Sequence, residues 1–267
     1  MQTLLELDYY LSVAKSTILK ASHLIQYRIQ ENRFNVFEKA SETDLVTSVD
    51  KEIDQFITTR LKQHFPTHEF ITEEAISQQN SEPSSNQFTW IVDPIDGTTN
   101  FIHGFPHFSI SIALTYGQDI LIGIIYDIIV NDIYVAIKGQ GAFLNNNLIS
   151  CSSTFDYKNS LLSFGFTDTD WNDKETILPR IEKQIGTCRS LRISGSACLD
   201  FAYVASGKID GMWYKGLKPW DKAAGILLVQ EAGGICSDFS GRTHSLLNRA
   251  EIVATNRYIH SEALTYL

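Results

Sequence analysis

The sequence predicts an α/β (α+β) fold in which helices lie in layers against mixed sheets. Three observations support this fold class: an amphipathic helical pattern opens the chain, strand patterns fill its middle, and helix and strand patterns alternate in its second half. We divide the chain at the Asn-rich run that begins at Asn145. This division gives an N-terminal half over residues 1–145 and a C-terminal half over residues 146–267.

Apolar residues at steps of three and four predict the first helix. They form one stripe of Leu4, Leu7, Leu11, Ala14, Ile18, Ala21 and Ile25. A second helix is expected after Ser48 and before Pro66, which ends the helical pattern. Residues 78–87 are rich in Ser, Asn, Gln, Glu and Pro, so we expect an exposed loop there.

The middle of the chain changes to strand patterns. We expect strands over residues 88–92, 108–114, 121–126 and 133–137. The turn Gly139-Gln-Gly141 should end this β-rich stretch. In the second half we expect helices over residues 197–206 and 221–232 and a buried strand over residues 252–254, with Gly207 and Gly233 closing the two helices.

Composition excludes several classes of protein. The 267 residues are 43% hydrophobic and 20% charged, which is enough apolar material for a sizeable core. Lys and Arg number 22 against 31 Asp and Glu, so the net charge of −9 argues against a nucleic-acid or membrane-surface binder. The four cysteines form no metal-binding or disulfide spacing, and we find neither a leader nor a long apolar run. We therefore expect a cytoplasmic protein with reduced thiols.

The most informative segment, WIVDPIDGTTNF, runs from Trp90 to Phe101. An apolar strand delivers Asp93 and Asp96 into a turn that contains Pro94 and Gly97. Two carboxylates at this spacing can face one point, and Mg²⁺ prefers such oxygen ligands. The amides of the turn can hold an anion. An ordinary Asp-Gly turn at the end of a strand fits the same residues equally well.

Three further acidic segments allow two interpretations each. Glu73 and Glu74 follow a short apolar strand and are either ligands or a solvated pair. Asp50 leads into a helix, and Asp221 stands at the start of another. Helix capping explains both positions and does not exclude metal binding.

Taken together, these segments resemble the inositol monophosphatase family. The matching motifs are Asp44-Leu-Val-Thr followed by Asp50, Glu73-Glu74, Asp93-Pro-Ile-Asp96-Gly-Thr-Thr-Asn, Gly195-Ser-Ala197 and Trp220-Asp221-x-Ala-Ala-Gly. The resemblance runs from about residue 39 to residue 236. It implies a layered αβαβα sandwich, a fold that the family shares with fructose-bisphosphatases, and a homodimer.

The resemblance also implies roles for individual residues. Mg²⁺ would be held by Glu73, Asp93, the Ile95 carbonyl, Asp96 and Asp221. The attacking water would be positioned by Glu73 and by Thr98, which Asp50 orients. The substrate would be contacted by Asp96, Gly97, Thr98, Gly195, Ser196, Ala197, Tyr214 and Asp221. Acidic residues alone would repel a phosphate, so the cluster makes chemical sense only with a metal.

We therefore expect Mg²⁺-dependent hydrolysis of a small phosphate monoester, such as inositol monophosphate or a related sugar or nucleotide phosphate. The alternatives are an NADP(H) or 3′-nucleotide phosphatase, a histidinol-phosphatase, a fructose-bisphosphatase, or a non-enzymatic regulatory protein that retains the fold. The expected partner is a small phosphorylated metabolite, with neither nucleic acid nor membrane.

One position departs from the family pattern. Relatives usually carry an acid six residues before the motif tryptophan, where it accepts hydrogen bonds from sugar hydroxyls, and here this residue is Tyr214. An aromatic ring there could stack on a ring or base of the substrate. Lys215 and Lys218 either meet a second anionic group or are solvated surface lysines.

Overall fold

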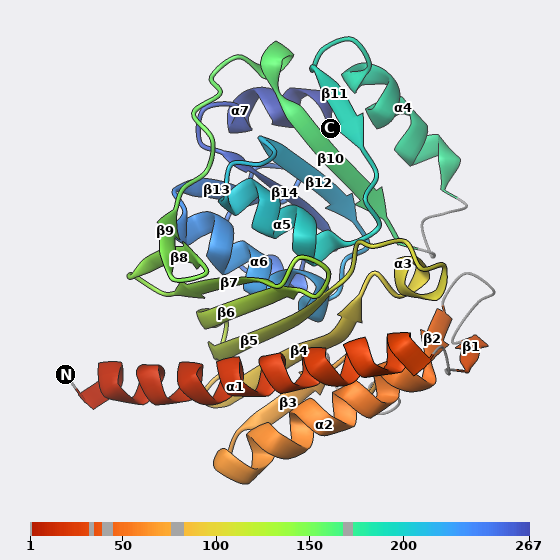
Figure 1. Cartoon of the computed structure of the whole chain (residues 1–267). Helices are drawn as coiled ribbons and strands as arrows, with labels where there is room; N and C mark the ends of the chain where they lie inside the picture. Colours follow the sequence, from red (N-terminus) through yellow and green to blue (C-terminus); the bar gives the residue numbers. More distant parts are fainter. Residues whose placement is uncertain (1, 32–34, 39–44, 76–82, 168–172) are drawn as a thin grey trace.

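The computed structural model describes the chain except for residues 1, 32–34, 39–44, 76–82 and 168–172. Figure 1 shows five layers: a helix pair, a first sheet, a second helix pair, a second sheet and an outer helical layer. Asp44 and the first half of the loop expected over residues 78–87, residues 78–82, lie outside the described residues, whereas residues 84–87 are exposed as expected.

The first layer contains α1 (Gln2–Glu31) and α2 (Ser48–His64), and both expected helices are confirmed. The predicted stripe of α1 is buried at Ala14, Ile18, Ala21 and Ile25, where it packs on α2 and the first sheet. Ahead of α2, the short strands β1 (Val36–Glu38) and β2 (Leu45–Thr47) pair antiparallel.

The first sheet has seven strands in the order β3-β4-β5-β6-β7-β8-β9. Their bounds are β3 (Glu69–Thr72), β4 (Phe88–Asp96), β5 (Ser109–Tyr116), β6 (Asp119–Asp127), β7 (Asp132–Ile137), β8 (Gly141–Leu144) and β9 (Asn147–Ile149). β3 and β4 are parallel, and the other neighbouring pairs are antiparallel. The four strands expected in this region are all present.

The expected end of the β-rich stretch at Gly139-Gln-Gly141 was wrong. This turn leads into the hairpin of β8 and β9. Asn145 and Asn146 connect the two strands with positive φ angles of 50° and 68°. Asn tolerates this left-handed conformation, which two-residue hairpin turns require. The sheet therefore continues to Ile149, and the division at residue 145 stays a prediction.

The middle layer consists of α5 (Ala197–Ala205) and α6 (Pro219–Glu231). Both expected helices are confirmed, although α6 starts two residues earlier than expected. They are apolar on nearly every side because sheets cover them on two faces. Their approach is so close that a Cβ on Gly225 would lie 2.3 Å from Cγ of Phe201.

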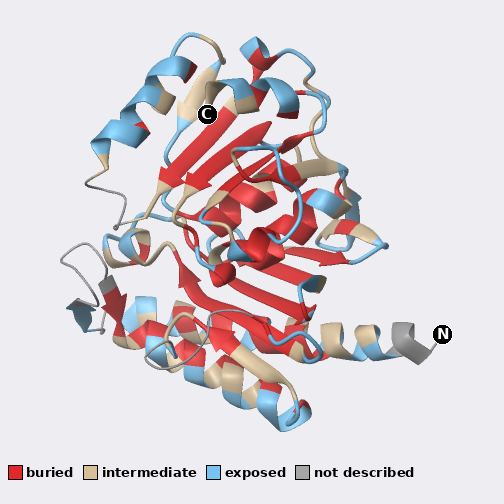
Figure 2. Cartoon of the chain, turned by 180° about the vertical axis from the view of Figure 1, so that it is seen from behind, coloured by how far each residue is buried: buried red, intermediate tan, exposed pale blue. Residues whose placement is uncertain are grey.

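The second sheet has the order β11-β10-β12-β14-β13 and includes the expected strand at residues 252–254. Its bounds are β10 (Leu161–Phe166), β11 (Ser190–Arg192), β12 (Gly211–Lys215), β13 (Gly234–Ser237) and β14 (Glu251–Asn256). The outer layer is formed by α4 (Lys174–Gln184) and α7 (His260–Ala263). Figure 2 shows that the strands and the middle helices are mostly buried, whereas the outer helix α4 is largely exposed. Among the described helices, none combines the length and the apolar character needed to cross a bilayer.

Candidate active site

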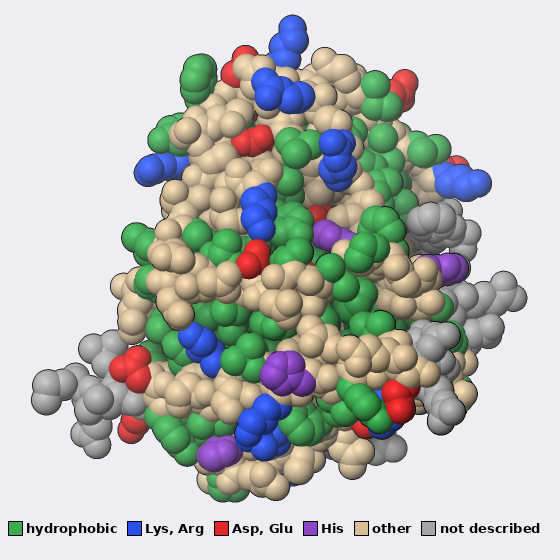
Figure 3. Space-filling view, viewed as in Figure 1, with side chains coloured by type: hydrophobic (Ala, Val, Ile, Leu, Met, Phe, Trp, Pro, Cys, Tyr) green, Lys and Arg blue, Asp and Glu red, His purple; other side chains and the backbone are tan. Residues whose placement is uncertain are grey.

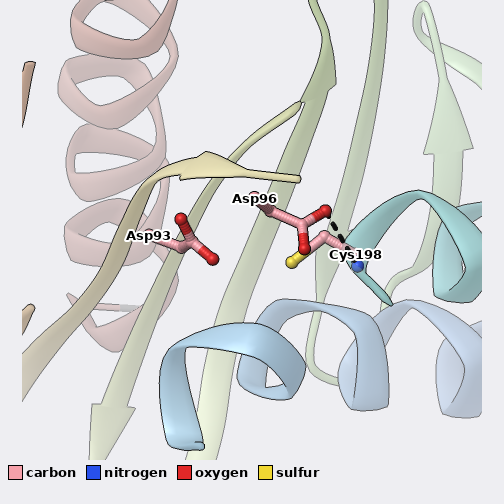
Figure 4. A group of neighbouring side chains, drawn as sticks. All are labelled: Asp93, Asp96 and Cys198. Carbon is pink, nitrogen blue, oxygen red and sulfur yellow. Dashed lines mark hydrogen bonds between the residues drawn. The ribbon is translucent and has the colours of Figure 1, made fainter. Parts of the chain in front are cut away.

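Strand β4 carries two acidic side chains at its carboxyl end. Asp93 and Asp96 are buried, with 2% and 7% of their surface exposed. Asp93 is paired with Ser111 of β5, and Asp96 is paired with Ser109. The chain advances three residues along β4 but only two along β5, which is a β-bulge. In a regular strand, residues three apart point to opposite faces. The extra residue of this bulge reverses the alternation, and Figure 4 shows both carboxylates in one space.

This bulge corrects the tight turn expected around Pro94. The strand continues to Asp96, and Pro94 lies within the irregular part. Proline has no N–H to donate to a ladder, which favours an irregularity at that point. Gly97 then reverses the chain with a φ of 92° and starts the short helix α3 (Thr98–Ile102). A Cβ at Gly97 would lie 3.1 Å from the carbonyl oxygens of Gly195 and His107, so space and backbone both favour glycine.

Thr98 and Asp50 meet at the starts of two helices. The Thr98 hydroxyl lies 3.0 Å from Oδ1 of Asp50 and 3.0 Å from the carbonyl oxygen of Ile95. Asp50 also belongs to the capping box of α2, where its Oδ2 accepts hydrogen bonds from the amide and the hydroxyl of Thr47. The capping interpretation of Asp50 is confirmed, and its other oxygen contacts Thr98.

Asp96 contacts the start of α5. Its carboxylate accepts hydrogen bonds from the amides of Ala197 and Cys198 at 3.1 and 3.2 Å, and from the hydroxyl of Ser196. The hydroxyl of Ser109 is a further donor at 3.1 Å. Burial raises the pKa of Asp96 to about 6, although these hydrogen bonds act in the opposite direction. The expected substrate segment at residues 195–197 therefore lies directly beside Asp96.

Glu73 and Asp221 complete a group of four acids. Glu73 follows β3, and its amide donates to the carbonyl of Val92 on β4. Asp221 lies in the first turn of α6, where its Oδ2 accepts a hydrogen bond of 2.7 Å from the amide of Lys218. Burial and then the charge of Glu73 raise the pKa of Asp221 to about 8. The capping interpretation of Asp221 is thus confirmed. The same carboxylate also lies close enough to Glu73 to be affected by its charge.

The same crowding also acts on Asp93. Burial raises its pKa well above its ordinary value, and neighbouring negative charges raise it further. Those charges belong to Glu73, Asp96 and Asp221. The structure therefore brings together the four carboxylates that the sequence placed in separate segments.

These residues fit a divalent cation. Oδ1 of Asp93 is buried and has no hydrogen-bond partner, although a buried polar atom without a partner costs free energy. A cation would satisfy that oxygen and would offset the repulsion among the acids. Carboxylate and carbonyl oxygens are the ligands that Mg²⁺ prefers.

Cys198 is a member of the site that the sequence did not reveal. Its Sγ and one oxygen each of Asp93 and Asp96 lie within 4.8 Å of one another. The sequence separates Cys198 from Asp96 by about a hundred residues, and only the contact of β4 with α5 joins them. Its position directly after Gly195-Ser-Ala197 was the one available signal.

The ring of Tyr214 is buried and is not open to a substrate, contrary to the expected stacking. Tyr214 lies in β12, is 6% exposed, and donates a hydrogen bond of 2.8 Å to Asp200 on α5. A Cβ on Gly165 would lie 2.2 Å from Cε1 of the ring, so the ring is tightly packed. Stacking on a substrate does not fit this burial. Asp200, which the sequence did not single out, is also buried, and burial raises its pKa to about 7.

Lys215 is engaged with the outer layer. Its ammonium group lies 2.5 Å from a carboxylate oxygen of Asp173 and 3.3 Å from the hydroxyl of Thr176 on α4. The Lys215 charge is thus already compensated within the chain. Lys218 is exposed beside Asp221, and its two interpretations, a solvated surface lysine or a contact with a second anionic group, both stay predictions.

Comparisons with known proteins extend over nearly the whole chain. Residues 6–267 match the model of the inositol monophosphatase family. Inositol monophosphatase 1 of Solanum lycopersicum is 38% identical over 255 residues, which cover 95% of this chain and 92% of that protein. Nus factor SuhB of Escherichia coli (strain K12) is 37% identical over 246 residues, covering 92% and 91%.

Solved structures share the layered fold. Extragenic suppressor protein suhB from Bartonella henselae has a TM-score of 0.87 and 32% identity, covering 96% of this chain and 97% of that one. An IMPase/NADP phosphatase complexed with Mg²⁺ and phosphate has a TM-score of 0.85 and 27% identity, covering 99% and 96%. The fold expected from the sequence is confirmed.

Proposed function

Because this chain belongs to the inositol monophosphatase family, we propose that it is a Mg²⁺-dependent phosphatase that hydrolyses a small phosphate monoester with a metal-activated water. The observation that carries the proposal is the group of four carboxylates around the unpartnered Oδ1 of Asp93. All four predicted acidic ligands are present in the chain, which favours an enzyme over a protein that retains only the fold.

The metal ligands in this proposal are Glu73, Asp93, the Ile95 carbonyl, Asp96 and Asp221. When bound, Mg²⁺ would neutralise phosphate oxygens, lower the pKa of bound water and stabilise the departing alkoxide. A relative of known structure was obtained with Mg²⁺ and phosphate, which supports this choice of cation. The carboxylate oxygens of the chain supply the hard ligands that this cation requires.

The water is positioned by Thr98 and Glu73. The Thr98 hydroxyl has one hydrogen, and Asp50 and the Ile95 carbonyl both lie 3.0 Å from its oxygen as acceptors. Because the hydrogen is directed to one of these acceptors, the lone pairs of Thr98 are free to accept a hydrogen bond from the water. Glu73 is the second acceptor in the proposal. Asp50 is a positioning residue, since it acts through the Thr98 hydroxyl.

In this proposal the phosphate is held by the main-chain amides that follow Asp96. The amides of Gly97 and Thr98 stand at the turn into α3, where N–H groups favour an anion. Gly195, Ser196 and Ala197 border the substrate, although the Ser196 hydroxyl already donates to Asp96. Specificity for the remainder of the substrate falls to α5 and β12, where Tyr214 holds Asp200 in place.

The substrate class is a small phosphorylated metabolite. The relatives are named for inositol monophosphate and for NADP, and these define the first two candidates. Figure 3 shows Lys and Arg side chains spread singly over the visible face. The expected absence of a nucleic-acid partner is nevertheless not confirmed, because one relative is named a Nus factor. We also propose that the protein is cytoplasmic and that it forms a homodimer. Sedimentation of the purified chain would test the dimer.

A phosphate-release assay tests the proposal. The purified chain with Mg²⁺ would be given inositol, sugar, nucleotide, NADP and histidinol phosphates, with parallel reactions in excess EDTA. We expect release from at least one substrate with Mg²⁺ and none with EDTA. Full activity in EDTA would overturn the metal mechanism. If no phosphate is released from any substrate, a non-enzymatic regulatory role becomes the better proposal, since one relative is named a Nus factor.

A further inference from the structure

We propose that Cys198 supplies a sulfur ligand to the acidic site, so that Asp93, Asp96 and Cys198 together bind a thiophilic divalent cation such as Zn²⁺ or Co²⁺. This inference rests on the metal site of the proposed function and adds a second class of cation to it. It follows from the side chains that β4 and α5 bring together.

The sulfur atom lies between two elements of the site. Figure 4 shows the Cys198 Sγ beside the Asp96 carboxylate, on the side that faces Asp93. The main-chain amide of Cys198 donates a hydrogen bond to Asp96. The Sγ of Cys198 lies 3.3 Å from the main-chain carbonyl oxygen of Asp221. The residue is fully buried, so packing on both sides fixes the position of the sulfur.

A second observation points to a ligand in this space. Oδ1 of Asp93 has no hydrogen-bond partner, and the residue is only 2% exposed. Buried carboxylate oxygens in proteins normally have partners. Of the three potential ligand groups, Asp96 and Cys198 already hydrogen-bond to α5 and α6, whereas this oxygen of Asp93 is left for an occupant.

The distances suit a small cation with modest adjustment. Zinc lies about 2.0–2.2 Å from carboxylate oxygens and about 2.3 Å from cysteine sulfur. Ligands of one tetrahedral ion are therefore roughly 3.5 Å apart. The three ligand atoms lie within 4.8 Å of one another, so side-chain shifts of about 1 Å would complete the contact.

The chemistry of the ligands separates two classes of cation. Mg²⁺ binds oxygen ligands and has little affinity for sulfur, whereas Zn²⁺ and Co²⁺ also bind thiolate. When Cys198 binds such a cation, its S–H bond is replaced by a bond from sulfur to metal, and the proton passes to the buffer. Cys198 would thus raise the affinity of the site for thiophilic cations relative to Mg²⁺.

Spectroscopy of the metal-free full-length chain tests this inference without an activity assay. Co²⁺ would be titrated while the near-ultraviolet band of cobalt–thiolate charge transfer is recorded. Calorimetry would measure binding of Zn²⁺ and Mg²⁺. The variants are Cys198→Ala and Cys198→Ser, and the control is Cys236→Ala. Cys236 is also buried, but its Sγ faces the carbonyl of Ile226 in the core.

We expect the band in the wild type and in Cys236→Ala, and we expect its loss in both Cys198 variants. The ratio of Zn²⁺ to Mg²⁺ affinity should fall by about tenfold or more in those variants. The inference is overturned if Co²⁺ saturates the wild type without a thiolate band, or if the band persists in Cys198→Ala or Cys198→Ser. Failure of the proposed function would appear separately, as absent phosphate release with Mg²⁺ while the cobalt band remains.

Discussion

The hydroxyl of Thr98 lies 3.0 Å from the carboxylate of Asp50, and this contact joins the first turn of α3 to the first turn of α2. Asp50 uses its other oxygen to cap its own helix, so the capping hydrogen bonds hold its carboxylate independently of Thr98. The two residues are 48 positions apart in the chain. Their contact links a stable helix start to the residue that orients water in the proposed mechanism.

Thr98→Ala should lower kcat by about a hundredfold or more, because the variant loses the hydroxyl that positions the water. Thr98→Ser should restore most of the activity, since serine keeps the hydroxyl. Thr58→Ala is the control, because Thr58 bonds only to the main chain of α2 in the contacts described. Steady-state kinetics with Mg²⁺ would measure all three. Equal kcat in wild type and Thr98→Ala would show that the hydroxyl has no role in the reaction.

Asp93→Asn should lower kcat by several orders of magnitude, because it removes a charged ligand from the centre of the acidic group. Asp221→Asn should have a similar effect. Without metal, Asp93→Asn should raise the free energy of unfolding, since a neutral amide removes repulsion from Glu73 and Asp96. Kinetics and chemical denaturation in EDTA would measure the two effects.

The control for these variants is Asp238→Asn. Asp238 is equally buried, but it pairs with Arg242 in the turn after β13. This variant should lose stability while keeping kcat. Near-normal turnover of both Asp93→Asn and Asp221→Asn at saturating Mg²⁺ would refute their assignment as metal ligands.

Acid should destabilise the protein partly through His260. The ring is 6% exposed and lies 2.9 Å from the hydroxyls of Ser237 and Thr255. Burial lowers its pKa to about 4, from about 6.5 in the unfolded chain. Because the unfolded chain binds the proton first, the stability is present above pH 6.5 and is lost as the pH falls towards 4.

This loss amounts to at most about 3 kcal/mol, from the difference in pKa between the two states. Urea denaturation of the wild type and of His260→Asn at several pH values would measure it. The variant should show a flatter dependence between pH 6.5 and 4.5. Parallel curves for the two proteins would mean that His260 does not titrate in this range.

Tyr214→Phe should lower the free energy of unfolding by about 1–3 kcal/mol, because it leaves the buried carboxyl of Asp200 without this hydrogen bond. If Asp200 helps to select the substrate, the ratios of kcat/KM across a panel of phosphate monoesters should also change. Tyr258→Phe is the control, because it alters an exposed tyrosine and should change neither quantity. Unchanged ratios in Tyr214→Phe would exclude the Tyr214–Asp200 pair from substrate selection.

Several parts of the fold escaped prediction for identifiable reasons. The hairpin of β8 and β9 consists of strands of four and three residues, which are too short for a periodic pattern. Helix α4 contains Pro179 and a largely polar sequence, so its helical pattern is weak. The burial of Tyr214 was missed because nothing in its own segment shows that Gly165 on β10 leaves room for the ring.

The sequence by itself determined the family, the order of the main helices and central strands, and the acidic residues that the site requires. These features are local, because periodicity, capping and motif spacing are written in neighbouring residues. Only the tertiary structure decided that a bulge turns Asp93 and Asp96 to one face, that Cys198 joins them, and that Tyr214 contacts Asp200. Each of these depends on contacts between distant segments, and such contacts are set by strand register and helix packing.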